Sequence, residues 1–84
     1  MLDNAGVRRL QGDRIRKARH RQHLSLQTLA DTLGVSVQAI SAWELGHASP
    51  VWAIQIPLCR ALDTRWSWIF YPDLLTIAKE TATP

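Results

Sequence analysis

Apolar positions recur at helical spacing in the middle of the chain. The intervals i, i+3, i+4 and i+7 define one face of an amphipathic helix, and its members are Leu26, Leu29, Ala30 and Leu33. Ser25 precedes this run as an N-cap, because its hydroxyl can accept from a free first-turn N–H. Gly34 follows as a residue that readily adopts the left-handed conformation of a C-cap. The pattern therefore predicts a helix over residues 26–33.

A second helical pattern follows at once. Only Val35 separates Gly34 from a further N-cap, Ser36. The next helix is predicted over residues 37–45, with Gly46 at its end. Its buried face comprises Ile40, Trp43 and Glu44.

Three more helices are predicted, over residues 11–22, about 57–62 and 66–70. The second begins near Pro57, because proline has no N–H to donate and is tolerated in the first turn. Asp63 and Thr64 are the expected cap for the third. The domain over 11–70 lies between a flexible arm, residues 1–10, and a C-terminal extension, residues 71–84.

The two central helices meet the demands of a helix-turn-helix. Ala30 supplies a small side chain where the helices touch, and Gly34 tolerates the positive φ of the turn. Val35 is the apolar residue that the turn buries, and Ile40 and Trp43 hold the second helix against the first. These matched constraints predict a helix-turn-helix.

Charge is concentrated near the N-terminus. The formal net charge of the 84 residues is +3, but the segment 8–21 holds seven basic residues and one acid, a net of +6. A one-sided basic surface suits a polyanion such as DNA; the alternative is a solvated basic helix. No apolar run approaches membrane-spanning length and no signal peptide is visible, so a cytoplasmic protein is expected.

Three stretches, RIRKAR, LSLQTLADTLGVSVQAISAWELG and CRALDTRWSWIF, resemble the Cro and lambda-type repressor helix-turn-helix family, also called XRE, over about residues 11–70. The resemblance implies an all-α, five-helix, lambda-repressor-like domain whose third helix enters the major groove of DNA. It also implies a phosphate contact from a glutamine at the start of the second helix. Leu26 stands there, and Gln27 and the Ser25 hydroxyl are the alternatives for that contact.

The outward face of helix 37–45 is the candidate base-reading surface. It comprises Val37, Gln38, Ala39, Ser41 and Ala42. Gln38 suits a two-point hydrogen bond to adenine N6 and N7, and the apolar members suit thymine methyl groups. In the alternative, these small side chains only let the helix approach closely, and DNA shape supplies specificity.

Phosphate contacts position a protein on DNA without reading its sequence. The candidates are Arg14, Lys17, Arg21, Ser25, Gln27, Ser36, His47 and Ser49. The resemblance also implies a structural ion pair between Arg19 and Glu44. A bidentate arginine offsets the cost of burying the carboxylate; the alternative is two surface charges worth under about 1 kcal/mol.

Aromatic and apolar residues gather after the helix-turn-helix. They are Trp52, Trp66, Trp68, Phe70, Tyr71, Leu74, Leu75 and Ile77. Helix 66–70 is expected to turn Trp66, Ile69 and Phe70 toward the core and Trp68 away from it. The predicted dimer interface comprises Trp68, Tyr71, Leu74 and Leu75, because exposed apolar clusters mark interfaces. The alternative is an extension folded back onto its own core.

Catalytic and metal-binding patterns are weak in this chain. His20 and His23 are three residues apart, but neither a cysteine nor a carboxylate lies near them in sequence, so solvated histidines and no metal are expected. Cys59 lies among leucines and is expected in the core, which fits a reducing compartment. Without a glycine-rich phosphate loop or a nucleophile motif, neither an enzyme nor a cofactor is expected.

These observations favour a sequence-specific transcriptional regulator. The expected form is a homodimeric repressor that binds a palindromic double-stranded operator through helix 37–45. The alternative is an antitoxin or adaptor that uses the same fold mainly to bind a protein partner. The basic segment favours the first interpretation, and the apolar outward face of helix 37–45 keeps the second open.

Overall fold

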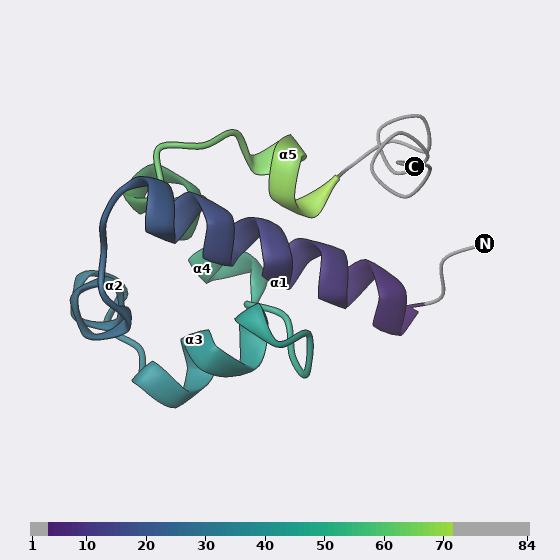
Figure 1. Ribbon diagram of the computed structural model, residues 1–84, viewed down its shortest axis with the longest axis horizontal. Helices are drawn as coiled ribbons and strands as arrows, with labels where there is room; N and C mark the ends of the chain where they lie inside the picture. The colour runs from purple at the N-terminus through teal and green to yellow at the C-terminus, as the bar shows by residue number, and fades with distance from the viewer. Residues whose placement is uncertain (1–3, 72–84) are drawn as a thin grey trace.

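The computed structural model describes residues 4–71, and every regular element in this range is helical (Figure 1). The elements are α1 (Asn4–Arg21), α2 (Leu26–Leu33), α3 (Val37–Glu44), α4 (Trp52–Ala61) and α5 (Trp66–Phe70). The all-α, five-helix fold is therefore confirmed. α1 crosses the molecule, with α3 packed on one side and α5 on the other, while α2 packs against α3 and α4.

The α2–turn–α3 unit follows the predicted local chemistry. Ser25 Oγ accepts from the Thr28 N–H at 3.0 Å, and Ser36 Oγ accepts from the Ala39 N–H at 3.0 Å. Gly34 adopts φ 70°, and its N–H donates to Ala30 at the end of α2. Both N-caps and the left-handed C-cap are confirmed, so the relation between the two helices is set locally.

The core draws side chains from all five helices. Its members are Ile15, Ala18, Leu29, Ala30, Ile40, Trp43, Leu58, Cys59, Leu62 and Ile69. Leu33 and Val35 pack against its edge, half-buried. The predicted inward positions of α2 and α3 are thus confirmed, and Cys59 is a core side chain as expected.

The prediction of a flexible arm over residues 1–10 is wrong for positions 4–10, the part of it that the structure describes. Positions 4–10 belong to α1, which continues without a break to Arg21. These turns pack instead of extending into solvent, because Gly12 lets α1 approach the backbone of Trp43 and Glu44 closely. Arg8 Nε also donates to the Gly46 carbonyl at 3.3 Å. Tertiary contact therefore lengthens the helix beyond its sequence pattern.

The predicted start of the fourth helix is also wrong. α4 begins at Trp52 and contains Pro57 in its interior. Pro57 lies on the exposed side, where water can reach the carbonyl of Ala53 that loses its donor. Gln55 donates to the Pro50 carbonyl at 3.1 Å and accepts from Trp66 Nε1 at 2.8 Å. These bonds hold the turns before the proline in place.

The last described helix has the predicted bounds but not the predicted cap. α5 spans Trp66–Phe70, and its N-cap is Arg65, whose side chain makes no capping bond. Asp63 instead adopts φ 50° at the end of α4. The residue uses the tolerance of aspartate for the left-handed region rather than its carboxylate.

Candidate nucleic-acid interface

The outward face of α3 combines one polar side chain with small and apolar ones. Gln38 is exposed, whereas Ser41 and Ala42 are half-buried. Val37 and Ala39 are half-buried as well and pack against the edge of the core. Gln38 is therefore the member of the predicted base-reading set that projects furthest into solvent.

A buried ion pair fixes the far end of α3. Arg19 Nε donates to Glu44 Oε2 at 2.6 Å, and Nη2 donates to Oε1 at 3.1 Å, the pairing that the sequence analysis expects. The two side chains are 10% and 8% exposed, respectively. Arg19 Nη1 also donates to the Leu24 carbonyl at 2.9 Å. One guanidinium thus joins α1, the α1–α2 turn and α3, and this sets the angle at which α3 is presented.

Several predicted phosphate contacts lie at helix N-termini. Ser25 and Ser36 are exposed caps of α2 and α3. Gln27, also exposed, donates to Asp31 at 2.8 Å within α2. Backbone N–H groups at such ends favour an anion, so the structure places these side chains where a phosphate would be tolerated.

The other predicted phosphate contacts are scattered. Lys17 is exposed and pairs with Asp13 at 3.0 Å along α1. His47 and Ser49 are exposed in the loop after α3, and Ser49 Oγ lies 3.4 Å from Gln11 Oε1. These assignments remain predictions, and the geometry shows that the three side chains reach solvent.

Arg14 is a wrong prediction as a phosphate contact. Its side chain is 1% exposed and donates to the Trp68 carbonyl. Its guanidinium lies 5.0 Å from the centroid of the Trp68 ring, within cation–π range. Arg14 faces α5 rather than solvent, because it shares the inner side of α1 with Ala18. Arg14 therefore has a structural role, although it lies in the basic segment 8–21.

The expected orientation of Trp68 is wrong for the same reason. The ring is half-buried, packs against the core and lies beside Arg14 and Arg21 of α1. Tyr71, in contrast, is 72% exposed. The remaining members of the predicted dimer interface, Leu74 and Leu75, lie outside the described residues.

Two exposed arginines beside α3, Arg9 and Arg16, were not predicted from the sequence as DNA contacts. Arg16 lines a hollow of about 270 Å³ together with Leu26, Ser41 and Leu45. Arg9 lies against Gly46, directly after α3. The sequence did contain a signal for them. Once Arg19 is paired with Glu44 of α3, helical periodicity puts Arg16 and Arg9 on the same side of α1 as Arg19, which is the side that faces α3.

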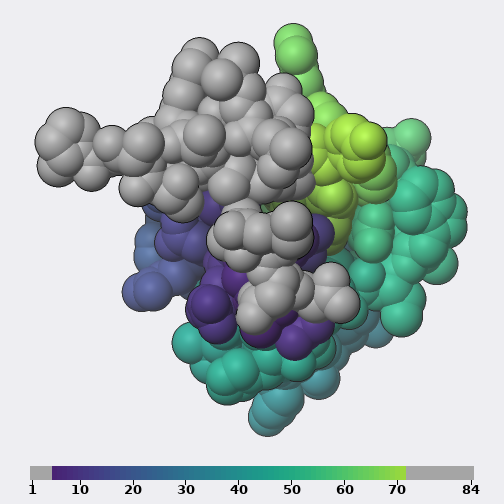
Figure 2. Space-filling view, turned by 90° about the vertical axis from the view of Figure 1, so that its right-hand side faces the viewer, coloured from purple at the N-terminus to yellow at the C-terminus, as the bar shows by residue number. Residues whose placement is uncertain are grey.

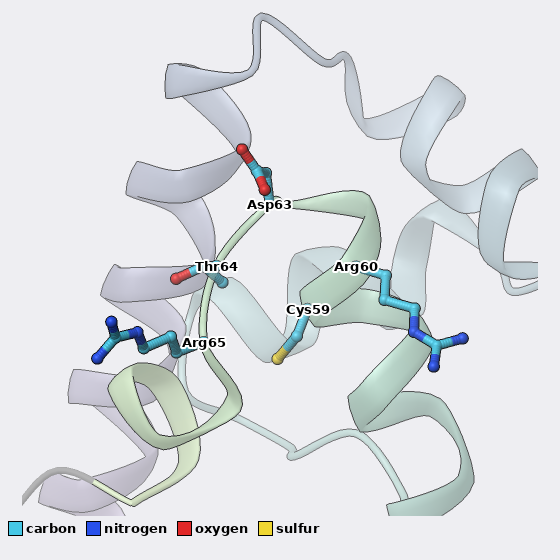
Figure 3. A pocket seen from close by; sticks show the side chains of 5 residues that line it. All are labelled: Cys59, Arg60, Asp63, Thr64 and Arg65. Carbon is cyan, nitrogen blue, oxygen red and sulfur yellow. The ribbon is translucent and has the colours of Figure 1, made fainter.

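A second hollow lies between the end of α4 and the start of α5 (Figure 3). It measures about 420 Å³ and is lined by Cys59, Arg60, Asp63, Thr64 and Arg65. Arg60 and Arg65 project to opposite sides, so the cations do not converge on one point. Burial raises the pKa of the Cys59 thiol above its ordinary value, which keeps the sulfur protonated and weakly nucleophilic.

The described part of the chain contains neither a metal-ligand cluster nor a membrane-spanning helix. Over residues 4–71 there is no group of three or more histidine, cysteine, aspartate or glutamate side chains that could hold a metal ion. Over the same range no helix is long and apolar enough to cross a membrane.

Comparison with known proteins agrees with the geometry of α2 and α3. A family model described as helix-turn-helix matches residues 15–50, from the middle of α1 to the loop after α3. No curated protein matches the chain. The matched segment holds both N-caps, the Gly34 turn and the Arg19–Glu44 pair. The match supports, for residues 15–50, the resemblance to the XRE-type helix-turn-helix family that the sequence suggests.

Proposed function

We propose that the protein is a transcriptional repressor that binds a palindromic operator as a homodimer, with α3 in the major groove. The observation that carries this proposal is the exposed Gln38 on a helix held rigidly at its other end by the Arg19–Glu44 pair. A glutamine in this position can form two hydrogen bonds with one adenine. Rigid presentation lowers the entropy lost on binding.

An exposed aromatic surface supports a dimer. Trp52 is 69% exposed, and its ring meets the Trp66 ring edge-on at 5.8 Å. Trp66 in turn stacks on Tyr71 at 6.3 Å. Apolar surface of this kind favours a symmetric partner. A dimer would place two copies of α3 one DNA turn apart, about 34–36 Å, and so double the sequence that one short helix can read.

The test is a selection from a random DNA library, followed by affinity measurements on the selected duplex and on a scrambled one. Gln38→Ala should lower affinity for the selected duplex by about 1–3 kcal/mol and leave affinity for the scrambled duplex nearly unchanged. An equal loss on both duplexes would show that Gln38 does not read a base. Sedimentation of the wild type on the same duplex gives the number of copies bound.

A second candidate function rests on the small and apolar side chains of the same face, Val37, Ala39 and Ala42, and on an exposed leucine directly after α3. Leu45 at the end of α3 is 58% exposed, and it shares a hollow with Leu26. In an antitoxin or adaptor, this surface would receive an apolar side chain of a protein partner. A library selection that enriches no sequence, with binding to DNA that is weak at every salt concentration, would favour this function over the first.

A further inference from the structure

The first turns of α1 pack against the end of α3 and the loop that follows it. Figure 2 shows these turns, in purple, directly against the teal surface of that segment. Arg8 Nε donates to the Gly46 carbonyl at 3.3 Å, and Gln11 Oε1 lies 3.4 Å from Ser49 Oγ. Arg8 and Gln11 precede the family match, which begins at position 15, whereas Gly46 and Ser49 lie within it. The first turns of α1 thus contact the helix-turn-helix segment from outside the matched range.

Two cations of α1 lie along this contact and face solvent. Arg16 lines the hollow that also contains Ser41 and Leu45 of the α3 end. A Cβ built on Gly46 would lie 2.9 Å from Arg9 Cγ, which places Arg9 beside the loop after α3. Seven residues separate the two arginines, which is two helical turns or about 10 Å along α1.

Arg9 and Arg16 differ from the neighbouring cations of α1 in their ion pairing. Lys17 and Arg19 are held in ion pairs with Asp13 and Glu44. Among residues 4–71, neither Arg9 nor Arg16 has a carboxylate within ion-pair distance. α3 itself, VQAISAWE, contains no lysine or arginine. Side-chain cations that attract a DNA backbone must therefore come from elements beside α3, and these two side chains are exposed there.

We propose that Arg9 and Arg16 form a DNA-backbone contact surface on α1, separate from the base-reading face of α3. This inference rests on the proposed function, since it takes α3 to lie in the major groove. Phosphates along one strand are about 3.4 Å apart in axial rise, so cations about 10 Å apart meet different phosphates. The surface adds affinity on any sequence and holds α1 against the backbone that flanks the groove.

The experiment measures the salt dependence of binding to a scrambled duplex, from about 50 to 200 mM salt. Each phosphate that a protein cation neutralises contributes about 0.9 to the magnitude of the slope of log K against log salt. Arg9→Gln and Arg16→Gln should each lower the slope by about that amount, and the double variant by about twice as much. Arg9→Lys and Arg16→Lys keep the charge and should keep the slope.

Arg65→Gln is the matched control. Arg65 is exposed at the start of α5, on the other side of α1 from α3, so its loss should leave the slope unchanged (Figures 1 and 3). If the Arg9→Gln/Arg16→Gln double variant kept the wild-type melting curve and the wild-type salt slope, the proposed contact surface would be refuted, while the proposed function would stand. Loss of slope in Arg65→Gln equal to that in Arg16→Gln would overturn it too. A wild type that binds no duplex at all would overturn both this surface and the proposed function.

Discussion

α1 buries one arginine on each of two sides, and the two are held by different chemistry. Toward α3, Arg19 forms two hydrogen bonds with the Glu44 carboxylate, at 2.6 and 3.1 Å. Toward α5, Arg14 donates to the Trp68 carbonyl and lies under the Trp68 ring at 5.0 Å. The first arrangement joins two opposite charges in a planar fork, and the second uses a backbone oxygen and an aromatic face.

The difference separates a side that sets geometry from a side that completes the core. A bidentate pair fixes orientation as well as distance, which suits the helix that would be presented to DNA. A cation on a ring tolerates sliding and tilting, which suits a short helix such as α5 whose role is to cover apolar surface. The α3 side should therefore respond more sharply to substitution than the α5 side.

The largest effect is expected at the closest approach of α1 to α3. A Cβ on Gly12 would lie 2.2 Å from the Trp43 carbonyl oxygen and 2.7 Å from that of Glu44. Backbone atoms cannot rotate out of the way, so Gly12→Ala should cost more than about 4 kcal/mol, above the usual 1–3 kcal/mol of overpacking. Urea unfolding measures this loss.

Gly34→Ala is the control for the glycine substitution. Gly34 has φ 70° but nothing within 4 Å of the added methyl group, so only conformational strain applies. The expected cost is about 1–2 kcal/mol. If both variants lost the same stability, the approach at Gly12 would be looser than the structure shows.

Glu44→Ala should have the next largest effect. The substitution leaves the Arg19 guanidinium buried without its carboxylate, at a cost of about 3 kcal/mol, the lower end for a broken buried pair because a tenth of the surface stays exposed. Asp13→Ala removes the exposed Lys17–Asp13 pair and should change stability by less than about 0.5 kcal/mol. Equal melting temperatures for the two variants would show that the Glu44 carboxylate is exposed to solvent.

Trp68→Ala tests the α5 side. Its half-buried ring covers the core and stacks with Arg14 and Arg21, so its removal should cost about 2–3 kcal/mol, less than for a fully buried tryptophan. Trp52→Ala, at an exposed ring, should cost under about 1 kcal/mol. A stable, fully folded Trp68→Ala monomer, obtained from a wild-type dimer, would instead restore Trp68 to the dimer interface.

The two sides of α1 also differ in what the sequence predicts. α2, α3 and their turn follow from short-range rules: a serine cap accepts from the N–H three residues on, and Gly34 adopts the φ that its lack of a side chain permits. Glu44 sits on the inner face of α3, where a buried charge needs a partner. The identity of that partner, Arg19, was implied by the family resemblance rather than by any short-range rule.

The elements that sequence patterns missed depend on contacts between distant residues. The helical state of positions 4–10 rests on Gly12 and on Arg8 meeting a loop 38 residues away. The start of α4 rests on Gln55 bridging Pro50 and Trp66. Burial of Arg14 depends on where α5 docks, because a backbone carbonyl and a ring face have no sequence spacing that identifies them.

Apart from the control variants, Arg21→Gln should have the smallest effect on stability, and it sharpens the comparison most directly. The Arg21 guanidinium lies over Trp68 at 5.4 Å but is exposed, so the loss should be within about 0.5–1 kcal/mol. Its predicted role as a phosphate contact makes a second demand, because a residue that contacts DNA must also lower the salt slope. A stacked Arg21 lies on the α5 side of α1, and we expect the slope for a scrambled duplex to stay at the wild-type value. A slope lower by about 0.9 with unchanged stability would show that Arg21 leaves the ring to meet a phosphate, and the basic surface of α1 would then extend to its C-terminal end.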